Sequence, residues 1–121
     1  NAYKLSFNLS NFVWRKVISW NYFERDTVGK QFVRAVDSIS ANIAEGFDNE
    51  STAEFARFLG MARRSAVEVQ SLLYVALDAN YIKDDTFKTH YDQARKTQAI
   101  IGGLKKGILK NPRRPKPAST S

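Results

Sequence analysis

Apolar residues recur every three or four positions along most of the chain, which is the spacing of one face of an α-helix. In the clearest case, within Lys30–Phe47, large apolar side chains return at intervals of four, three, four and four residues: Phe32, Val36, Ile39, Ile43 and Phe47. Three other stretches share this periodicity: about Leu9 to Glu24, Ser51 to Asn80, and Asp84 or Asp85 to Ile108. No segment alternates like a β-strand, so the pattern predicts an all-α protein.

Local signals set the helix ends. Asp26–Gly29 is typical of a turn, and Gly46 stands where a helix C-cap is expected. Ser51 and Glu54 form a capping box, in which both side chains satisfy free N–H groups of the first turn. Asp84 or Asp85 is expected to cap the last helix. That helix is weakened by three glycines, at about 1 kcal/mol each: Gly102, Gly103 and Gly107.

Short connections between four helices predict an antiparallel up-down four-helix bundle over residues 1–110. The third helix would be about 43 Å long at about 1.5 Å per residue, which implies an elongated molecule. Residues 111–121 contain three prolines and the basic residues Arg113, Arg114 and Lys116. This composition predicts a disordered basic C-terminal tail.

Composition narrows the function classes. With 121 residues the chain suits one domain, and 19 Lys and Arg against 12 Asp and Glu give a net charge of +7. This favours an acidic partner, nucleic acid ahead of a membrane surface. The absence of cysteine excludes disulfides and thiolate chemistry. No apolar run reaches the roughly 18 residues of a membrane span, so we expect a cytoplasmic protein with no membrane partner.

A stripe of small or short side chains runs beside the apolar face of the second helix: Ala35, Ser38, Asn42 and Gly46. Small side chains allow another backbone to approach closely, so this stripe is expected to meet a neighbouring helix, within or between subunits. We expect Glu45 to reach a neighbouring helix or subunit as well.

The same stretch carries a resemblance. Gln31, Arg34, Ala35, Ser38, Ile39 and the run Asn42-Ile-Ala-Glu-Gly46 resemble the signature of the four-helix bundle proteins called 23S rRNA-intervening-sequence proteins. The stretch EFARFLGMARRSAVEVQSLL is similar to the next helix of that family. It departs from the family's A-R-G-S motif at one position, since Arg64 replaces the usual glycine.

The resemblance implies a bundle that assembles into a homopentameric ring, with no enzymatic activity defined. A related branch comprises the accessory variability proteins of diversity-generating retroelements. Those pentamers are basic, bind nucleic acid and contact the retroelement reverse transcriptase. For this chain the resemblance therefore implies self-association, with RNA or DNA, and a reverse transcriptase, as candidate partners.

No residue pattern predicts catalysis, a cofactor or a metal site. His90 is the only histidine and is expected to be a surface or partly packed residue, since a metal site needs several converging ligands. Asp37 and Glu45 are about 12 Å apart along one helix, too far for joint action on one bond. Asp37 is instead expected to pair with Arg34 or Ser38. We therefore predict a non-enzyme.

The basic residues are the candidates for nucleic-acid binding. Arg57, Arg63 and Arg64 can line one side of the third helix, where guanidinium groups suit phosphate. The alternative is a solvated face, with Arg64 paired to Glu68 and Arg57 beside Glu54. Further candidates lie on the first helix and in the tail: Arg15, Lys16, Arg113, Arg114 and Lys116.

Aromatic residues crowd the first helix: Trp14, Trp20, Tyr22 and Phe23. Its core stripe is predicted to be Val13, Val17 and Trp20, widened by Trp14 and Ile18. A base-stacking platform is one interpretation of the aromatics, and core or subunit-interface packing is the favoured one. Two hypotheses for function follow: a homo-oligomeric nucleic-acid-binding or scaffolding protein, and an oligomeric protein–protein adaptor with no nucleic-acid role.

Overall fold

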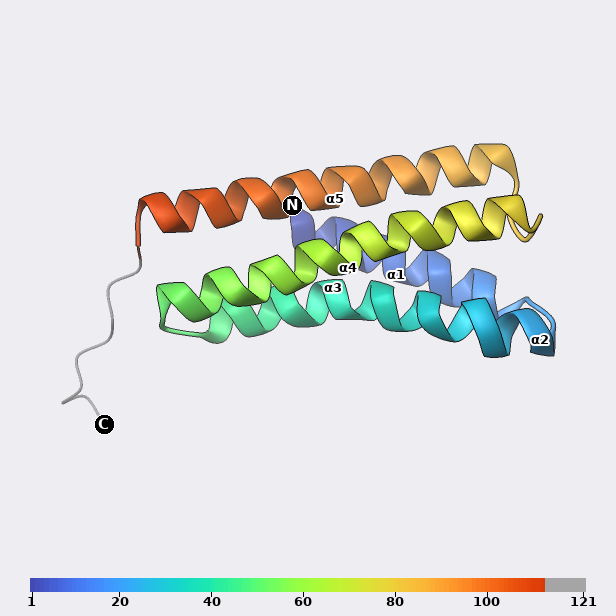
Figure 1. Cartoon of the computed structure of the whole chain (residues 1–121), viewed down its shortest axis with the longest axis horizontal. Coiled ribbons are helices and arrows are strands. Elements are labelled where there is room, and N and C mark those ends of the chain that lie inside the picture. Colours follow the sequence, from blue (N-terminus) through green and yellow to red (C-terminus); the bar gives the residue numbers. More distant parts are fainter. Residues whose placement is uncertain (113–121) are drawn as a thin grey trace.

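The computed structural model describes residues 1–112, and in them the backbone forms four long helical segments (Figure 1). α1 spans Ala2–Ile18. After a break, α2 (Tyr22–Glu24) continues through a π-helical turn, η1 (Arg25–Gly29), into α3 (Lys30–Asp48). α4 (Thr52–Asp78) and α5 (Asp84–Lys110) complete the fold. This part of the chain contains no β-strand, so the predicted all-α bundle is confirmed.

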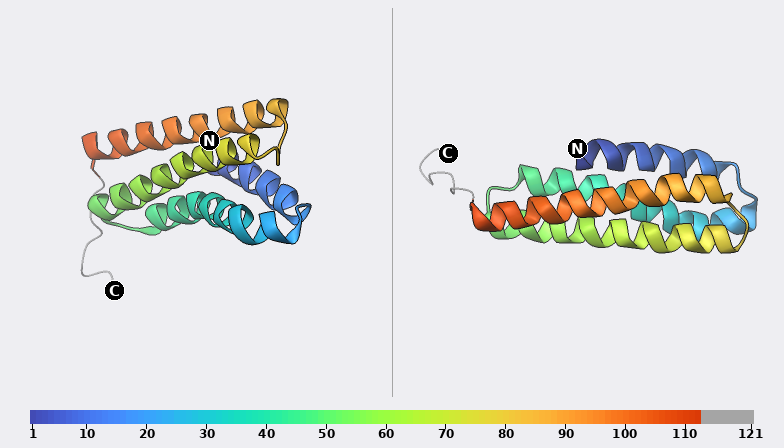
Figure 2. Two further views of the ribbon diagram at one scale, coloured as in Figure 1. Left: turned by 45° about the vertical axis from the view of Figure 1, so that its right-hand side comes forward. Right: turned by 90° about the horizontal axis from the view of Figure 1, so that it is seen from above.

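The four segments pack as a closed square. α1 and α4 each pack against both α3 and α5, so α1 and α4 occupy diagonal positions. The bundle is elongated, and α1 runs beside only part of the length of α5 (Figure 2). α4 and α5 have 27 residues each, or about 40 Å at about 1.5 Å per residue. One end of the α4–α5 pair therefore lies beyond the reach of α1.

The predicted apolar stripes form the core between these helices. Its fully buried side chains come from all four segments: Leu9, Val36, Ile39, Leu59, Val69, Leu73 and Ile101. Two buried hydroxyls, of Ser6 and Thr97, donate to backbone carbonyls of their own helices, at 2.7 Å and 2.8 Å. They can therefore lie in an apolar interior without an unsatisfied polar group.

The first helix differs from the predicted range of Leu9 to Glu24. It begins at Ala2, after the Asn1 side chain accepts a hydrogen bond of 2.8 Å from the backbone N–H of Lys4. Its buried stripe continues towards the N-terminus through Ser6 and Ala2. Because neither is a large apolar residue, hydrophobic periodicity did not reveal this part of the helix.

The predicted turn at Asp26–Gly29 is also wrong, because these residues belong to η1 and lead directly into α3. Gly29 is buried there, and a Cβ at this position would lie 2.7 Å from Cγ1 of Val17. The glycine is therefore required by the close approach of α1, not by a change of chain direction.

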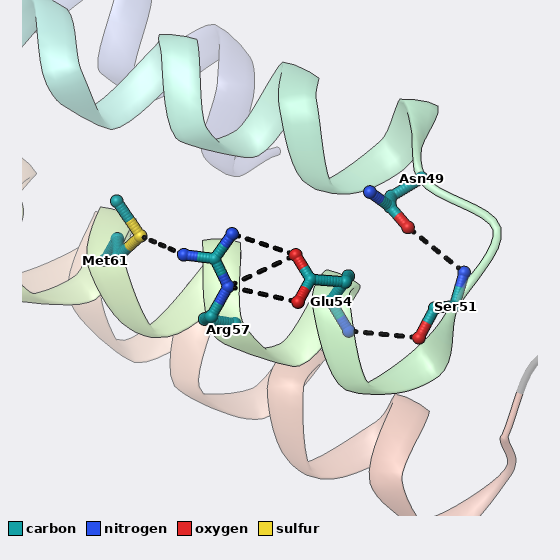
Figure 3. A network of polar contacts seen from close by, with 5 residues as sticks. All are labelled: Asn49, Ser51, Glu54, Arg57 and Met61. Atoms are coloured by element: carbon teal, nitrogen blue, oxygen red, sulfur yellow. Dashed lines mark hydrogen bonds and ion pairs between the residues drawn. The ribbon is translucent and has the colours of Figure 1, made fainter.

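At the α3–α4 connection the predicted ends are partly correct. Gly46 is not the C-cap, because α3 continues to Asp48 and is capped by Asn49. Phe47 is exposed instead of buried. Ser51 caps α4 as predicted, since its hydroxyl accepts a hydrogen bond from the backbone N–H of Glu54. The reciprocal half of the capping box is replaced: the Ser51 N–H donates to Oδ1 of Asn49, at 3.2 Å (Figure 3).

The α4–α5 connection contains a residue in the left-handed conformation. Asn80 has φ of 63°, and the N–H of Tyr81 donates to the carbonyl of Ala76 at 2.7 Å. This left-handed residue ends α4 in a Schellman motif. The N-cap of α5 is Lys83, so Asp84 and Asp85 lie inside the first turn instead of capping it. Their negative charges still interact favourably with the positive, N-terminal end of the helix dipole. Among the described helices, none combines the length and apolar character of a membrane span.

Candidate nucleic-acid interface

A groove runs along the solvent-facing side of the α4–α5 pair. It consists of two hollows of about 670 Å³ and 390 Å³, which share Arg63 and Lys105 in their walls. The larger hollow is also lined by Arg95, Gln98, Gly102 and Lys106, and the smaller by Arg57, Gly60 and Arg64. We call these residues together the α4–α5 groove.

Two glycines allow long basic side chains to lie across the groove. A Cβ on Gly60 of α4 would be 3.1 Å from Nζ of Lys105, which reaches over from α5. A Cβ on Gly102 of α5 would be 3.7 Å from Nε of Arg63, which reaches over from α4. Each helix therefore provides a position without a side chain for a cation of the other helix.

The groove concentrates positive charge, and within residues 1–112 only Arg57 among its cations forms an ion pair. Six cations line it: Arg57, Arg63, Arg64, Arg95, Lys105 and Lys106. No aspartate or glutamate is among its lining residues. Since like charges at short range repel, such a cluster favours the binding of an anion with several charges.

Arg57 is the exception, because it is paired along its own helix (Figure 3). Its guanidinium donates to the carboxylate of Glu54, with the shortest contact at 2.8 Å, and lies over the ring of Phe58. Hydrogen bonding to Arg57 lowers the pKa of Glu54, and the same contact raises the pKa of Arg57. The alternative of a solvated pair therefore describes Arg57 well.

Arg63 and Arg64 differ from Arg57. In residues 1–112 neither arginine forms an ion pair, so the predicted pair of Arg64 with Glu68 is not formed. Of the three arginines expected to act together, the structure brings all into one groove but leaves only these two electrostatically available.

The remaining basic candidates lie elsewhere. Arg15 and Lys16 are in the last turn of α1, diagonal to α4, and line neither hollow of the groove. Nε of Arg15 donates to the backbone carbonyl of Asn11 at 3.3 Å. Arg113, Arg114 and Lys116 lie outside the described residues.

Three cations of the groove were missed by sequence reasoning: Arg95, Lys105 and Lys106. In the sequence they are ordinary charged positions of an amphipathic helix. The available signal was the antiparallel register, which sets Gly60 opposite Lys105 and Arg63 opposite Gly102. That register can be predicted only when the length of the α4–α5 connection and the ends of both helices are known.

Two residues of the predicted assembly stripe, Ser38 and Gly46, contact α4 of the same chain. Ala35 is buried, and the hydroxyl of Ser38 is 3.0 Å from that of Ser65. Asn42 donates to the Ser38 hydroxyl at 2.9 Å. A Cβ on Gly46 would lie 2.9 Å from Cδ1 of Phe55. The close packing is therefore intramolecular at Ser38 and Gly46, whereas Glu45 is exposed.

Asp37 links α1 and α3 in a way that differs from the prediction. Its carboxylate accepts hydrogen bonds from the Ser10 hydroxyl at 2.7 Å and from Nε1 of Trp14 at 3.1 Å, instead of pairing with Arg34 or Ser38. Trp14 is 44% exposed and Ile18 is 62% exposed, so these residues do not widen the core stripe as predicted.

An apolar surface is exposed where α1 meets η1 and α3. Tyr22 and Phe23 of α2 are 73% and 69% exposed, and Trp14 and Ile18 of α1 are 44% and 62% exposed. We call these four residues the α1–α2 aromatic patch. A hollow of about 410 Å³ next to it is lined by Trp14, Ile18 and Val33 and by the cations Arg25, Lys30 and Arg34. A second hollow, lined by Tyr22, shares Arg25 and Lys30 in its walls with the first. Large contiguous apolar patches mark interaction surfaces in many proteins.

His90 is partly buried and stacks on Phe12, with ring centroids 3.4 Å apart. Its Nδ1 lies 2.8 Å from the carbonyl oxygen of Thr86. Burial lowers the pKa of His90. Across the described residues, no group of three or more histidine, aspartate and glutamate side chains could hold a metal ion.

Comparisons with known proteins agree with this architecture. The sequence profile of the 23S rRNA-intervening sequence protein family matches residues 1–103. A crystal structure of a protein of unknown function from the S23 ribosomal protein family of Bacteroides thetaiotaomicron superposes with a TM-score of 0.80. The alignment covers 87% of this chain and 95% of that one at 21% identity, so the similarity concerns the fold. No curated protein sequence matches the chain.

Proposed function

The chain belongs to the 23S rRNA-intervening sequence protein family, and from this premise we propose that it is a non-enzymatic, homo-oligomeric protein that binds RNA or DNA. The observation that carries the proposal is the α4–α5 groove, in which six cations and no acidic residue line a continuous surface. A nucleic-acid backbone offers the regularly spaced negative charges that such a groove would neutralise.

The chemistry of the groove favours contacts to phosphate over contacts to bases. Arg63, Arg64 and Arg95 carry planar guanidinium groups that bind phosphate oxygens bidentately, and Lys105 and Lys106 add point charges. None of these residues lies near the N-terminal end of its helix, which is the part that a recognition helix places against base edges. We therefore expect salt-dependent binding with little sequence preference.

Self-association would strengthen this binding. The α1–α2 aromatic patch supplies apolar area away from the groove, so subunits could associate without covering the cations. In the proposed pentameric ring, five copies of charge +7 would carry about +35. Once one groove holds a nucleic acid, the other grooves of the ring would be present at a high effective concentration for the same molecule. Light scattering of the purified protein measures the number of subunits directly.

The direct test is a salt titration of binding to an unrelated RNA and an unrelated DNA. We expect the Arg63→Ala/Lys105→Ala variant to weaken binding to both and to lower the log–log salt slope by about two. The matched control is Arg15→Ala/Lys16→Ala, which removes the same charge from α1 and should change binding little. A variant lacking residues 111–121 measures the contribution of the tail.

Failure of the intact protein to bind either nucleic acid at about 50 mM salt would overturn the proposal, because electrostatic affinity is strongest at low salt. A loss of binding in the truncated protein alone, with no effect of the groove variant, would assign binding to the tail instead of the folded surface.

The alternative function is an oligomeric protein–protein adaptor, and the α1–α2 aromatic patch is the observation that favours it. A reverse transcriptase of a diversity-generating retroelement is the candidate protein partner. A gene for that enzyme beside a variable repeat would support the partnership. A defined protein that copurifies with the intact chain, is lost in Tyr22→Ser/Phe23→Ser and carries no nucleic acid would support the adaptor function.

A further inference from the structure

The α4–α5 groove ends against a cluster of aromatic rings. Tyr74 of α4 contacts Phe87 and Tyr91 of α5, with ring centroids 4.9 Å and 5.2 Å away. Phe87 and Tyr91 stack on each other at 5.1 Å and pack against the core, whereas Tyr74 is 54% exposed and outside the core cluster. Tyr74 therefore presents an aromatic side chain to solvent although it also contacts two rings of the cluster.

This cluster and the groove lie on one continuous seam. Tyr74 opposite Tyr91, Arg63 opposite Gly102, and Gly60 opposite Lys105 follow the same antiparallel register. Between the Tyr74–Tyr91 contact and the Arg63–Gly102 contact, Nε2 of Gln70 donates to Oε1 of Gln98 at 2.8 Å and joins the two helices. Arg95, one turn beyond Tyr91, lines the groove itself. The rings therefore extend the cationic surface.

The length of the seam suits a strand of nucleic acid. Tyr91 and Lys105 are both on α5, and the helix between them spans about 21 Å at about 1.5 Å per residue. Proteins that bind single strands combine a cationic groove that follows the backbone with aromatic rings on which bases stack. A duplex keeps its base faces stacked internally, so exposed rings beside the cations would add nothing to duplex binding.

We propose that the α4–α5 seam is a binding site for single-stranded nucleic acid, in which Arg63, Arg95 and Lys105 hold phosphates and Tyr74 stacks on a base. This inference rests on the proposed function and adds the class of ligand. It predicts that the protein binds a single strand more tightly than a duplex with the same number of phosphates.

The test compares binding of an oligothymidylate of about 15 nucleotides with that of a duplex of equal phosphate number, using the full chain. Tyr74→Leu keeps apolar bulk but removes the ring, and should weaken single-strand binding about tenfold while leaving duplex binding unchanged. Tyr74→Phe keeps the ring and should bind like the original protein. The salt slope should be the same in all three, because no phosphate contact is lost.

A second measurement does not depend on any substitution. Irradiation of the full chain bound to an oligonucleotide containing 5-bromouracil should crosslink residues of α4 and α5 near Tyr74 and Tyr91. Crosslinks confined to other helices would overturn the single-strand site. Equal effects of Tyr74→Leu on both ligands, or no effect on either, would also overturn the single-strand site. If binding still depended on Arg63 and Lys105 in that case, the proposed function would remain intact. Absence of binding to both ligands would overturn both proposals.

Discussion

The side chain of Lys105 lies across Gly60, with its Nζ atom 3.1 Å from the position that a Cβ of Gly60 would occupy. The contact joins α5 to α4 at the point where the two hollows of the groove meet. A missing side chain on one helix thus positions a charge of the other. The stability of the fold and the charge of the groove can therefore be changed separately at this position.

Gly60→Glu should change the charge of the groove without lowering the stability of the fold. Glutamate has a higher helix propensity than glycine and can pair with Lys105, so the free energy of unfolding should stay equal or rise. The same carboxylate would neutralise the groove and lower polyanion affinity by about tenfold or more at low salt. Thermal denaturation and a binding titration measure the two effects. Gly60→Gln is the uncharged control, and an equal loss of affinity in it would show that shape matters instead of charge.

Ser38→Leu should destabilise the protein by about 1–3 kcal/mol, because the added methyl groups have no room at the α3–α4 contact. The Ser38 hydroxyl already lies 3.0 Å from that of Ser65. Urea denaturation measures the change in unfolding free energy. Glu45→Leu, an exposed change on the same helix, is expected to stay within about 0.5 kcal/mol. Equal stability of the two variants would contradict the tight packing of α3 on α4.

Two glycines within helices should respond in opposite directions to alanine. Nothing lies within 4 Å of a Cβ at Gly107, so Gly107→Ala should stabilise the protein by about 1 kcal/mol through helix propensity. At Gly46 a Cβ would lie 2.9 Å from Phe55, so Gly46→Ala should destabilise by about 1–3 kcal/mol. Melting temperatures of the two variants test this, and a shift in the same direction for both would disprove it.

His90 should make stability depend on pH. Burial, opposed by the hydrogen bond to Thr86, lowers the pKa of His90 below its ordinary value of 6.5. The unfolded chain therefore takes up a proton more readily, so stability is complete above about pH 6.5 and is lost as pH falls below it. Because the ring is only partly buried, the expected loss is under about 1 kcal/mol.

The measurement for His90 is the unfolding free energy at about pH 7.5 and pH 5.5. His90→Phe keeps an aromatic ring to stack on Phe12 and should show a smaller difference between the two values. An unchanged difference would assign the pH dependence to other groups.

The sequence determined the helical segments because periodic apolar residues must share one buried face. Phe32, Val36, Ile39 and Ile43 are buried as predicted, and so are the apolar residues of α4 that continue their pattern. Ser51 marked the start of α4 correctly, because N-capping depends only on neighbours in the chain. Predictions from local sequence failed at Gly29 and Gly46. In the sequence these glycines resemble a turn and a helix cap, but in the structure each is the point where two helices come into close contact.

The candidate site was likewise predicted in part from the sequence and completed only by the tertiary structure. Composition and spacing indicated a basic face with Arg63 and Arg64, since charge and helix geometry are properties of the sequence itself. Only the tertiary structure brought Lys105 and Arg95 beside them, because the partners of a groove depend on how two distant helices are set against each other. The sequence offered local partners for both Arg57 and Arg64. The structure forms the pair of Arg57 with Glu54 but not that of Arg64 with Glu68, because the rotamers that the surroundings allow decide which local pair is made.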